Sequence, residues 1–311
     1  MRRLKFLSLY NVFIFIMEIR KNSVRAWLLA TRPKTLAGAA VPVFIGSASA
    51  YNYGEFNIQV ALLCLVFAFL MQVDANFIND LFDFLKGSDT EERLGPQRAC
   101  AQGWIGRKAM TAGIAVTTLV AICTGLGLLA YAGPELIVIG ALCVVFAFLY
   151  TAGPYPLAYH GWGDVLVLVF FGFIPVGTTF YIMTHALTME VLMASLACGL
   201  VIDTLLLVNN YRDRDQDAAA GKRTLVVRWG AEAGLFMYMA AGVLACVCCL
   251  YFWERGDVYA AILPQFYLIP HIITALKMKK IGRGRELNVI LVRTSMNMLL
   301  FVILLSIGLL F

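Results

Sequence analysis

The feature that most constrains this chain is a series of long apolar runs separated by short polar segments. Nine runs of near-spanning length occur, at about residues 36–52, 60–84, 109–131, 135–151, 163–183, 189–209, 233–253, 257–275 and 287–311. A helix needs about 20 apolar residues to cross a bilayer. Because the runs are continuous rather than alternating, they predict helices and not a barrel. The predicted fold class is an all-α polytopic membrane protein, with nine transmembrane helices in a bundle around a cavity open to the cytoplasmic side.

Composition supports lipid as the solvent of this chain. It is 61% hydrophobic and 14% charged, whereas soluble domains are about 45–50% apolar and about 25% charged. The net charge of +6 is explained by orientation in the membrane, so no nucleic-acid partner is expected. If the amino terminus is inside, 23 of the 25 Lys and Arg residues lie in cytoplasmic segments and only Arg255 in an opposite loop. The positive-inside rule then predicts a multi-pass protein of the inner (plasma) membrane with a cytoplasmic amino terminus.

The chain divides into a basic amino-terminal segment, residues 1–24, and one transmembrane domain, residues 25–311. The apolar stretch from Leu7 to Met17 is too short to span a bilayer. Two interpretations fit residues 1–16: an interfacial helix, or an extension upstream of a native start at Met17.

A first polar motif lies at the end of the second apolar run. It contains Gln72, Asn76, Asn79 and Asp83 at spacings of 4, 3 and 4, which places all four on one face of a helix. Such a stripe must face a bundle interior or a wet cavity, because polar groups exposed to lipid are costly. Asp80, Lys86 and Asp89 follow the same run.

A second polar motif lies at the end of the sixth run. Asp203, Asn210 and Asp217 are spaced by sevens and nearly align on a helix, and Asp213 is one turn from Asp217. Beyond it we expect a long loop, residues 210–232, on the same side of the membrane as the long loop at 85–108.

Two acidic motifs beside several cations at one membrane face indicate a particular chemistry. Carboxylates repel phosphate but bind Mg²⁺, which prefers one or two carboxylates together with substrate phosphates. Neighbouring Lys and Arg neutralise the remaining phosphate charge. A lipid-embedded cavity suits an apolar tail, so the pattern favours an isoprenyl diphosphate. Two alternatives are solvated acidic turns and a proton- or ion-coupled transporter, in which Asp74 and Asp203 are the intramembrane acids.

From about residue 25 onward the motifs resemble the UbiA-type intramembrane prenyltransferases. That family has nine helices and two Asp-rich motifs, which correspond here to Asn79-Asp80-x-x-Asp83 with Asp89, and to Asp213-x-x-x-Asp217. Further local patterns resemble the subgroup that prenylates 1,4-dihydroxy-2-naphthoate in menaquinone biosynthesis. They are Arg32-Pro-Lys-Thr-Leu36, Arg93-Leu-Gly-Pro-x-Arg98, Tyr150-Thr-x-Gly-Pro-Tyr-Pro-Leu157, Gly163-Asp164, Asn209-Asn-x-Arg-Asp213 and, more weakly, Glu286-Leu-Asn288.

The resemblance implies a Mg²⁺-dependent aromatic prenyltransferase. It would transfer a polyprenyl group from an allylic polyprenyl diphosphate to dihydroxynaphthoate, releasing diphosphate and CO₂ and giving demethylmenaquinone. Within the family, 4-hydroxybenzoate, a haem, a chlorophyllide or a lipid alcohol are alternative acceptors.

The resemblance also implies roles for individual residues. The expected Mg²⁺ ligands are Asp83, Asp213, Asp217, Asp89 and Asn79, and further contacts to the metal and diphosphate are expected from Asn210, Asp80 and Asn76. The expected phosphate contacts are Lys86, Arg98, Lys222 and Arg228. Tyr150 and Tyr211 either face the allylic cation or are ordinary interfacial tyrosines. Arg32 either holds the carboxylate of the acceptor or is a topology charge.

Overall fold

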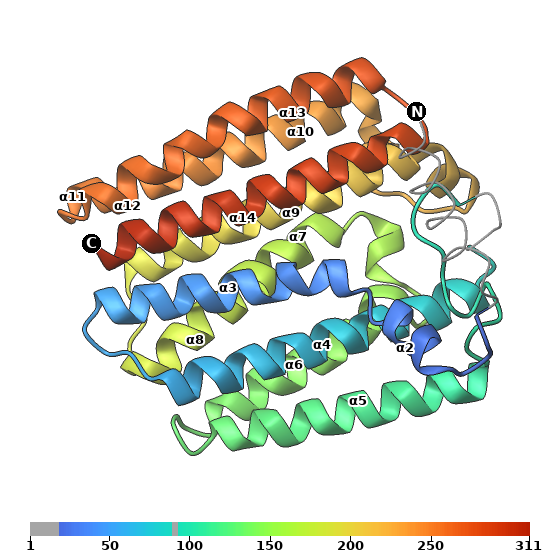
Figure 1. Ribbon diagram of the computed structural model, residues 1–311, viewed down its shortest axis with the longest axis horizontal. Helices are drawn as coiled ribbons and strands as arrows, with labels where there is room; N and C mark the ends of the chain where they lie inside the picture. Colours follow the sequence, from blue (N-terminus) through green and yellow to red (C-terminus); the bar gives the residue numbers. More distant parts are fainter. Residues whose placement is uncertain (1–18, 89–92) are drawn as a thin grey trace, which may run out of the picture.

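The computed structural model describes residues 19–88 and 93–311, and every regular element in these ranges is helical. The long helices run side by side along one direction (Figure 1). The elements are α2 (Val24–Ala30), α3 (Pro33–Asn52), α4 (Ile58–Leu85), α5 (Arg107–Leu128), α6 (Glu135–Thr151), η1 (Leu157–His160), α7 (Gly163–Val167), η2 (Leu168–Phe173), α8 (Ile174–Thr184), α9 (Met189–Ala219), α10 (Leu225–Cys249), α11 (Tyr251–Glu254), α12 (Val258–Ile262), η3 (Leu263–Tyr267), α13 (Leu268–Ile281), η4 (Arg285–Leu287) and α14 (Asn288–Leu310).

Each of the nine predicted runs coincides with helix, and the all-helical membrane class is confirmed. Within the described residues, seven helical segments are long and apolar enough to cross a bilayer. They are Ile58–Leu85, Arg107–Leu128, Gly163–Thr184, Met189–Ala219, Leu225–Glu254, Val258–Ile281 and Arg285–Leu310. The other two, α3 and the 17-residue α6, are not among these seven, so nine crossings stay a prediction, as does a cavity open to the cytoplasm.

The predicted loop over residues 210–232 is wrong. Helix α9 continues to Ala219, and α10 begins at Leu225 after a short turn with its amino end capped by Thr224. Within this helix the Asn209 side chain is satisfied, because its amide donates to the carbonyl of Leu205 one turn earlier. The second motif therefore projects from one face of a helix rather than from a loop.

The predicted run 163–183 is helical but not regular. A π-helical stretch, η2, separates α7 from α8. It packs against α9 at two glycines, where an added Cβ would lie 2.6 Å from the Ser195 carbonyl oxygen at Gly172 and 3.1 Å from the Leu168 Cα at Gly199. This close approach brings the start of α7 against the middle of α9.

The corner between α2 and α3 is fixed by backbone conformation and by a contact from α4. Pro33 occupies the first turn of α3, where its missing N–H costs nothing, and Arg32 before it has a φ of 51°. The Asn76 amide donates to the Thr31 carbonyl and to the Thr35 hydroxyl, both at 3.0 Å. Asn76 thereby holds this corner, and with it Arg32, against α4.

The helix arrangement brings both motifs to the same end of the molecule. In Figure 1, α10 and α13 lie along one edge and α5 along the other. Helix α9 packs on α10, η2, α3 and α14, while α4 packs on α5, α3 and α6. The carboxyl-terminal ends of α4 and α9 lie toward the right in this view, and this end carries both polar motifs.

Candidate functional site

A single cavity of about 860 Å³ connects the two motifs with the interior of the helix bundle. As the 4-3-4 spacing predicts, Gln72, Asn76, Asn79 and Asp83 all line it. Phe67 also lines it, and lies 16 residues before Asp83 on the same helix, or about 24 Å at 1.5 Å per residue. The cavity thus extends from the polar helix ends far into an apolar interior, whose lining includes Cys64, Phe67, Leu128, Leu136, Phe146, Phe170, Phe171 and Ile182.

Asp83 is the buried centre of the first motif. Its side chain is 3% exposed, and three groups from distant segments converge on it. The Tyr159 hydroxyl donates to one carboxylate oxygen at 2.9 Å. Nη2 of Arg98 lies 3.4 Å from the other oxygen, and Nζ of Lys222 lies 3.8 Å from the same atom. A buried carboxylate is tolerated because it is paired in this way.

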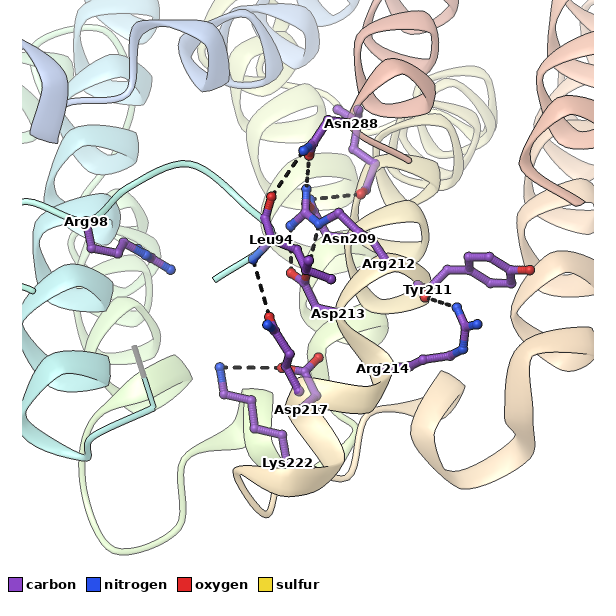
Figure 2. Close-up of polar contacts among 12 residues, drawn as sticks. Leu94, Arg98, Asn209, Tyr211, Arg212, Asp213, Arg214, Asp217, Lys222 and Asn288 are labelled. Carbon is purple, nitrogen blue, oxygen red and sulfur yellow. Dashed lines mark hydrogen bonds and ion pairs between the residues drawn. The ribbon is translucent and has the colours of Figure 1, made fainter. Parts of the chain in front are cut away.

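The second motif is joined to the first through Lys222. Its ammonium lies 3.9 Å from Asp217 as well as 3.8 Å from Asp83, so one cation sits between carboxylates of the two motifs. The Asp217 contact is drawn in Figure 2, and Arg98 points toward the α9 side chains from the segment after α4. The two motifs therefore form one site.

Asp213 is held by a network that reaches α14. Arg212 donates to its two carboxylate oxygens at 2.7 and 2.6 Å and to the Asn288 side chain at 2.8 Å. Asn288 in turn donates to the Leu94 carbonyl at 3.1 Å (Figure 2). Paired, bidentate contacts of this kind fix side-chain orientation. Asp213 lines the cavity with its position set by α14 and by residues 93–98.

Lys86 and Lys222 share an aromatic neighbour. The ammonium groups of both lie 4.7 Å from the centroid of the Tyr159 ring, a favourable cation–π geometry. Lys86 also donates to the Thr151 carbonyl at 2.6 Å and, unlike Lys222, is not part of the cavity lining. Burial lowers the pKa of the Lys86 ammonium, an effect that the nearby Asp83 opposes.

Most other predicted residues also line the cavity. They are Arg32, Asn76, Asn79, Arg98, Tyr150, Asn210 and Asp217. Asn79 accepts a hydrogen bond from the Thr151 hydroxyl at 3.0 Å, which orients its amide.

The structure places several predicted residues elsewhere. The backbone N–H groups of Ala99 and Cys100 donate to the two carboxylate oxygens of Asp80, both at 2.9 Å, so Asp80 anchors a loop and does not line the cavity. Arg228 donates to the carbonyls of Arg223 and His160 and is not part of the lining either. Asp89 lies outside the described residues.

Tyr211 also faces away from the cavity. It is buried in the cluster between α9 and α10, and Arg214 lies over its ring. Figure 2 shows both side chains on the opposite side of α9 from Asp213 and Asp217.

Sequence reasoning missed the roles of three residues. Tyr159 contacts Asp83, Asn288 positions Arg212, and Asp164 lines the cavity from α7. Asp164 and Asn288 stand within the local patterns quoted above, but Tyr159 follows its pattern by two residues. No sequence signal distinguishes it from the neighbouring Tyr155.

The donor set fits a divalent metal that arrives with a phosphate ligand. Among the described residues, no three His, Cys, Asp or Glu side chains come close enough to hold a metal ion by themselves. The oxygen donors of Asp83, Asp213, Asp217, Asn79 and Asn210 nevertheless line one cavity. Mg²⁺ is commonly held by one or two carboxylates and completed by substrate phosphates.

Fold and site together define a class: a helical membrane protein with an apolar cavity that ends in carboxylates, amides and cations. Within that class, the chain belongs to the UbiA prenyltransferase family, whose model matches residues 39–310. It is therefore a member of a family of prenyl-transferring enzymes, as the sequence motifs indicate.

Two relatives are named for the same activity. The chain is 38% identical over 301 residues to a 1,4-dihydroxy-2-naphthoate octaprenyltransferase from Haemophilus influenzae, covering 93% of this chain and 97% of the relative. It is 38% identical over 239 residues to the octaprenyltransferase of that name from Escherichia coli, covering 75% and 77%.

Among solved structures, the chain is similar to a UbiA homolog from Archaeoglobus fulgidus bound to GPP and Mg²⁺. The TM-score is 0.65 at 15% identity, and the match covers 92% of this chain and 99% of that one. At this identity the similarity concerns the fold.

Proposed function

We propose that this protein transfers a polyprenyl group from an allylic polyprenyl diphosphate to 1,4-dihydroxy-2-naphthoate, releasing diphosphate and CO₂ and giving demethylmenaquinol, the reduced form of demethylmenaquinone. The observation that carries the proposal is the single cavity in which the two acidic motifs and their cations continue into an apolar channel. The identity of the acceptor is inferred from the names of the relatives from Haemophilus influenzae and Escherichia coli.

The polar end of the cavity binds the diphosphate. Asp83, Asp213 and Asp217, with the amides of Asn79 and Asn210, would hold Mg²⁺ there. The UbiA homolog from Archaeoglobus fulgidus was solved bound to GPP and Mg²⁺. When bound, the metal neutralises the diphosphate and stabilises its departure. Lys222 and Arg98, which already face Asp83, neutralise part of the remaining phosphate charge.

The apolar part of the cavity receives the polyprenyl chain and keeps water from the reacting carbon. The C–O bond to the diphosphate breaks toward an allylic cation, and the electron-rich ring forms the new C–C bond. The acceptor carboxylate then leaves as CO₂ and returns its electron pair to the ring. Tyr150 lines this region, where an aromatic face favours a nearby cation.

Arg32 and Lys34 both line the cavity at the α2–α3 corner. We assign them to the carboxylate of the acceptor, since Arg matches the planar geometry of a carboxylate. The active domain is residues 25–311, in the inner membrane, with the amino terminus and the polar end of the cavity on the cytoplasmic side.

The test is turnover by the purified protein in detergent with Mg²⁺, a polyprenyl diphosphate and dihydroxynaphthoate. We expect prenylated product, loss of turnover with EDTA and recovery with added Mg²⁺. Asp83→Asn and Asp217→Asn should each lower kcat by at least about 100-fold. Asp215→Asn is the matched control, because Asp215 lies on α9 with its side chain 67% exposed and paired with Arg283. Wild-type protein without product refutes the proposal, and full activity of both cavity variants refutes the metal assignment.

A further inference from the structure

Two buried acids outside the motifs, Asp164 on α7 and Asp203 on α9, lie beside the cavity. They are 8% and 6% exposed and interact electrostatically with each other. Both carboxylate oxygens of Asp164 and Oδ1 of Asp203 lack a hydrogen-bond partner among the described residues. Asp164 lines the cavity and Asp203 does not, so Asp164 is the member of the pair that a ligand can reach.

This arrangement calls for a hydrogen-bond donor. A buried polar oxygen costs free energy unless a donor reaches it. Asp203, a neighbouring acid of like charge, supplies no hydrogen bond to the Asp164 oxygens among the described residues. Tyr150 is within electrostatic reach of both acids, and its hydroxyl would lie 3.7 Å from a Cβ added at Gly163, next to Asp164. Asp164 thus stands beside the part of the cavity that Tyr150 lines.

The chemistry of the reactants decides which ligand supplies the donor. The diphosphate is repelled by a carboxylate, and a polyprenyl tail has no donor. Only the aromatic acceptor carries hydroxyl groups. Its 1-hydroxyl adjoins the carboxylate and can bond within the molecule, whereas its 4-hydroxyl has no internal partner.

We propose that Asp164 accepts a hydrogen bond from the 4-hydroxyl of the aromatic acceptor, and that the negative charge of the neighbouring Asp203 strengthens Asp164 as an acceptor. This inference rests on the proposed function and names the residue that selects a dihydroxy acceptor. Arg32 and Asp164 line the same cavity, so they would orient the ring through its carboxylate and its hydroxyl.

The experiment compares two acceptors, 1,4-dihydroxy-2-naphthoate and 1-hydroxy-2-naphthoate, in wild type and in Asp164→Leu. The affinity of each naphthoate and kcat/KM for prenylation are measured on the full-length protein. Wild type should bind the dihydroxy compound more tightly by roughly 10- to 100-fold, as expected for a hydrogen bond to a charged group. In Asp164→Leu this preference in affinity should fall to about one, with KM for the polyprenyl diphosphate unchanged, while kcat should stay lower for the monohydroxy compound because its ring is less electron-rich. Asp203→Asn should reduce the preference partially.

Asp74→Asn is the matched control. Asp74 is also a fully buried intramembrane acid, and one of its oxygens likewise lacks a partner among the described residues, but the other accepts from the Thr118 hydroxyl at 2.8 Å and Asp74 does not line the cavity. It should keep the wild-type preference. If Asp164→Leu weakens both acceptors equally, Asp164 is structural and the inference is overturned. If wild type prenylates neither naphthoate, the proposed function has failed and the inference fails with it, so the two failures are distinguishable.

Discussion

Asp80 belongs to the first Asp-rich motif in sequence, yet its contacts give it a structural role. Its two oxygens accept the backbone N–H groups of Ala99 and Cys100 at 2.9 Å, and it is 1% exposed. In Asp80→Asn one oxygen is replaced by an amide donor that faces a backbone donor. Hydrogen bonds to a charged group contribute about 1.5–3 kcal/mol each, so the loss of one bond and the stranded donor should cost about 3 kcal/mol of unfolding free energy.

The assay is a thermal melt in detergent together with a Mg²⁺ titration of activity. At about 2–4 °C per kcal/mol, Tm should fall by about 6–12 °C. Activity should fall as well, because the Asp80 loop carries Arg98, but the Mg²⁺ concentration for half-maximal rate should not change. Asp83→Asn is the contrasting variant, in which the Mg²⁺ dependence itself should be lost or shifted. An Asp80→Asn protein with wild-type Tm and a raised Mg²⁺ requirement would refute this reasoning and make Asp80 a metal-site residue.

Two further predictions follow from contacts around the site. Tyr159→Phe removes the hydroxyl that donates to Asp83 but keeps the ring beneath the two lysines, so kcat/KM should fall roughly tenfold, and an unchanged value would contradict the contact. Both contacts of Arg228 are to backbone carbonyls. Arg228→Ala should therefore lower the unfolding free energy by roughly 1 kcal/mol without changing KM for the polyprenyl diphosphate. A large rise in that KM would show that Arg228 is a phosphate ligand after all.

The features that could be predicted from the sequence are those that helical periodicity determines. The apolar runs give the helices, and the spacing of Gln72, Asn76, Asn79 and Asp83 gives the cavity-lining face of α4. The same spacing fails for Asp80. It lies three residues before Asp83 and so near the same face, but the backbone of residues 99–100 folds against it and takes both oxygens.

Contacts between distant segments could not be predicted from the sequence, because they depend on tertiary packing and not on helical periodicity. Tyr159 reaches Asp83 across 76 residues of chain, and nothing local to either residue encodes that meeting. Arg228 has the charge expected of a phosphate ligand, yet at the start of α10 its guanidinium donates to two backbone carbonyls. Periodicity predicts faces within a helix, whereas tertiary packing decides which face meets which neighbour.

The position of Lys222 bears on how the proposed Mg²⁺ and diphosphate would bind. Gly221 precedes it with a φ of 75°, a conformation that favours glycine, and this turn carries the ammonium to within 3.8 Å of Asp83 and 3.9 Å of Asp217. The buried Asp83 and the partly buried Asp217 are stabilised by a cation between them, and a metal bound there would compete with Lys222. In the proposed complex with a metal and a diphosphate, Lys222 would pair with phosphate instead.

That exchange predicts effects of opposite sign for Lys222→Met. Without the competing ammonium, Mg²⁺ should bind the substrate-free protein more tightly, since the two carboxylates then lack a cation. KM for the polyprenyl diphosphate should rise, because a phosphate partner is lost. Calorimetric titration of Mg²⁺ and steady-state kinetics measure the two effects separately. If both affinities fall together, Lys222 supports the site structurally and does not exchange between carboxylate and phosphate. Lys34→Met is the control: it removes a cavity-lining cation that forms no ion pair with Asp83 or Asp217 among the described residues, so Mg²⁺ binding should be unchanged.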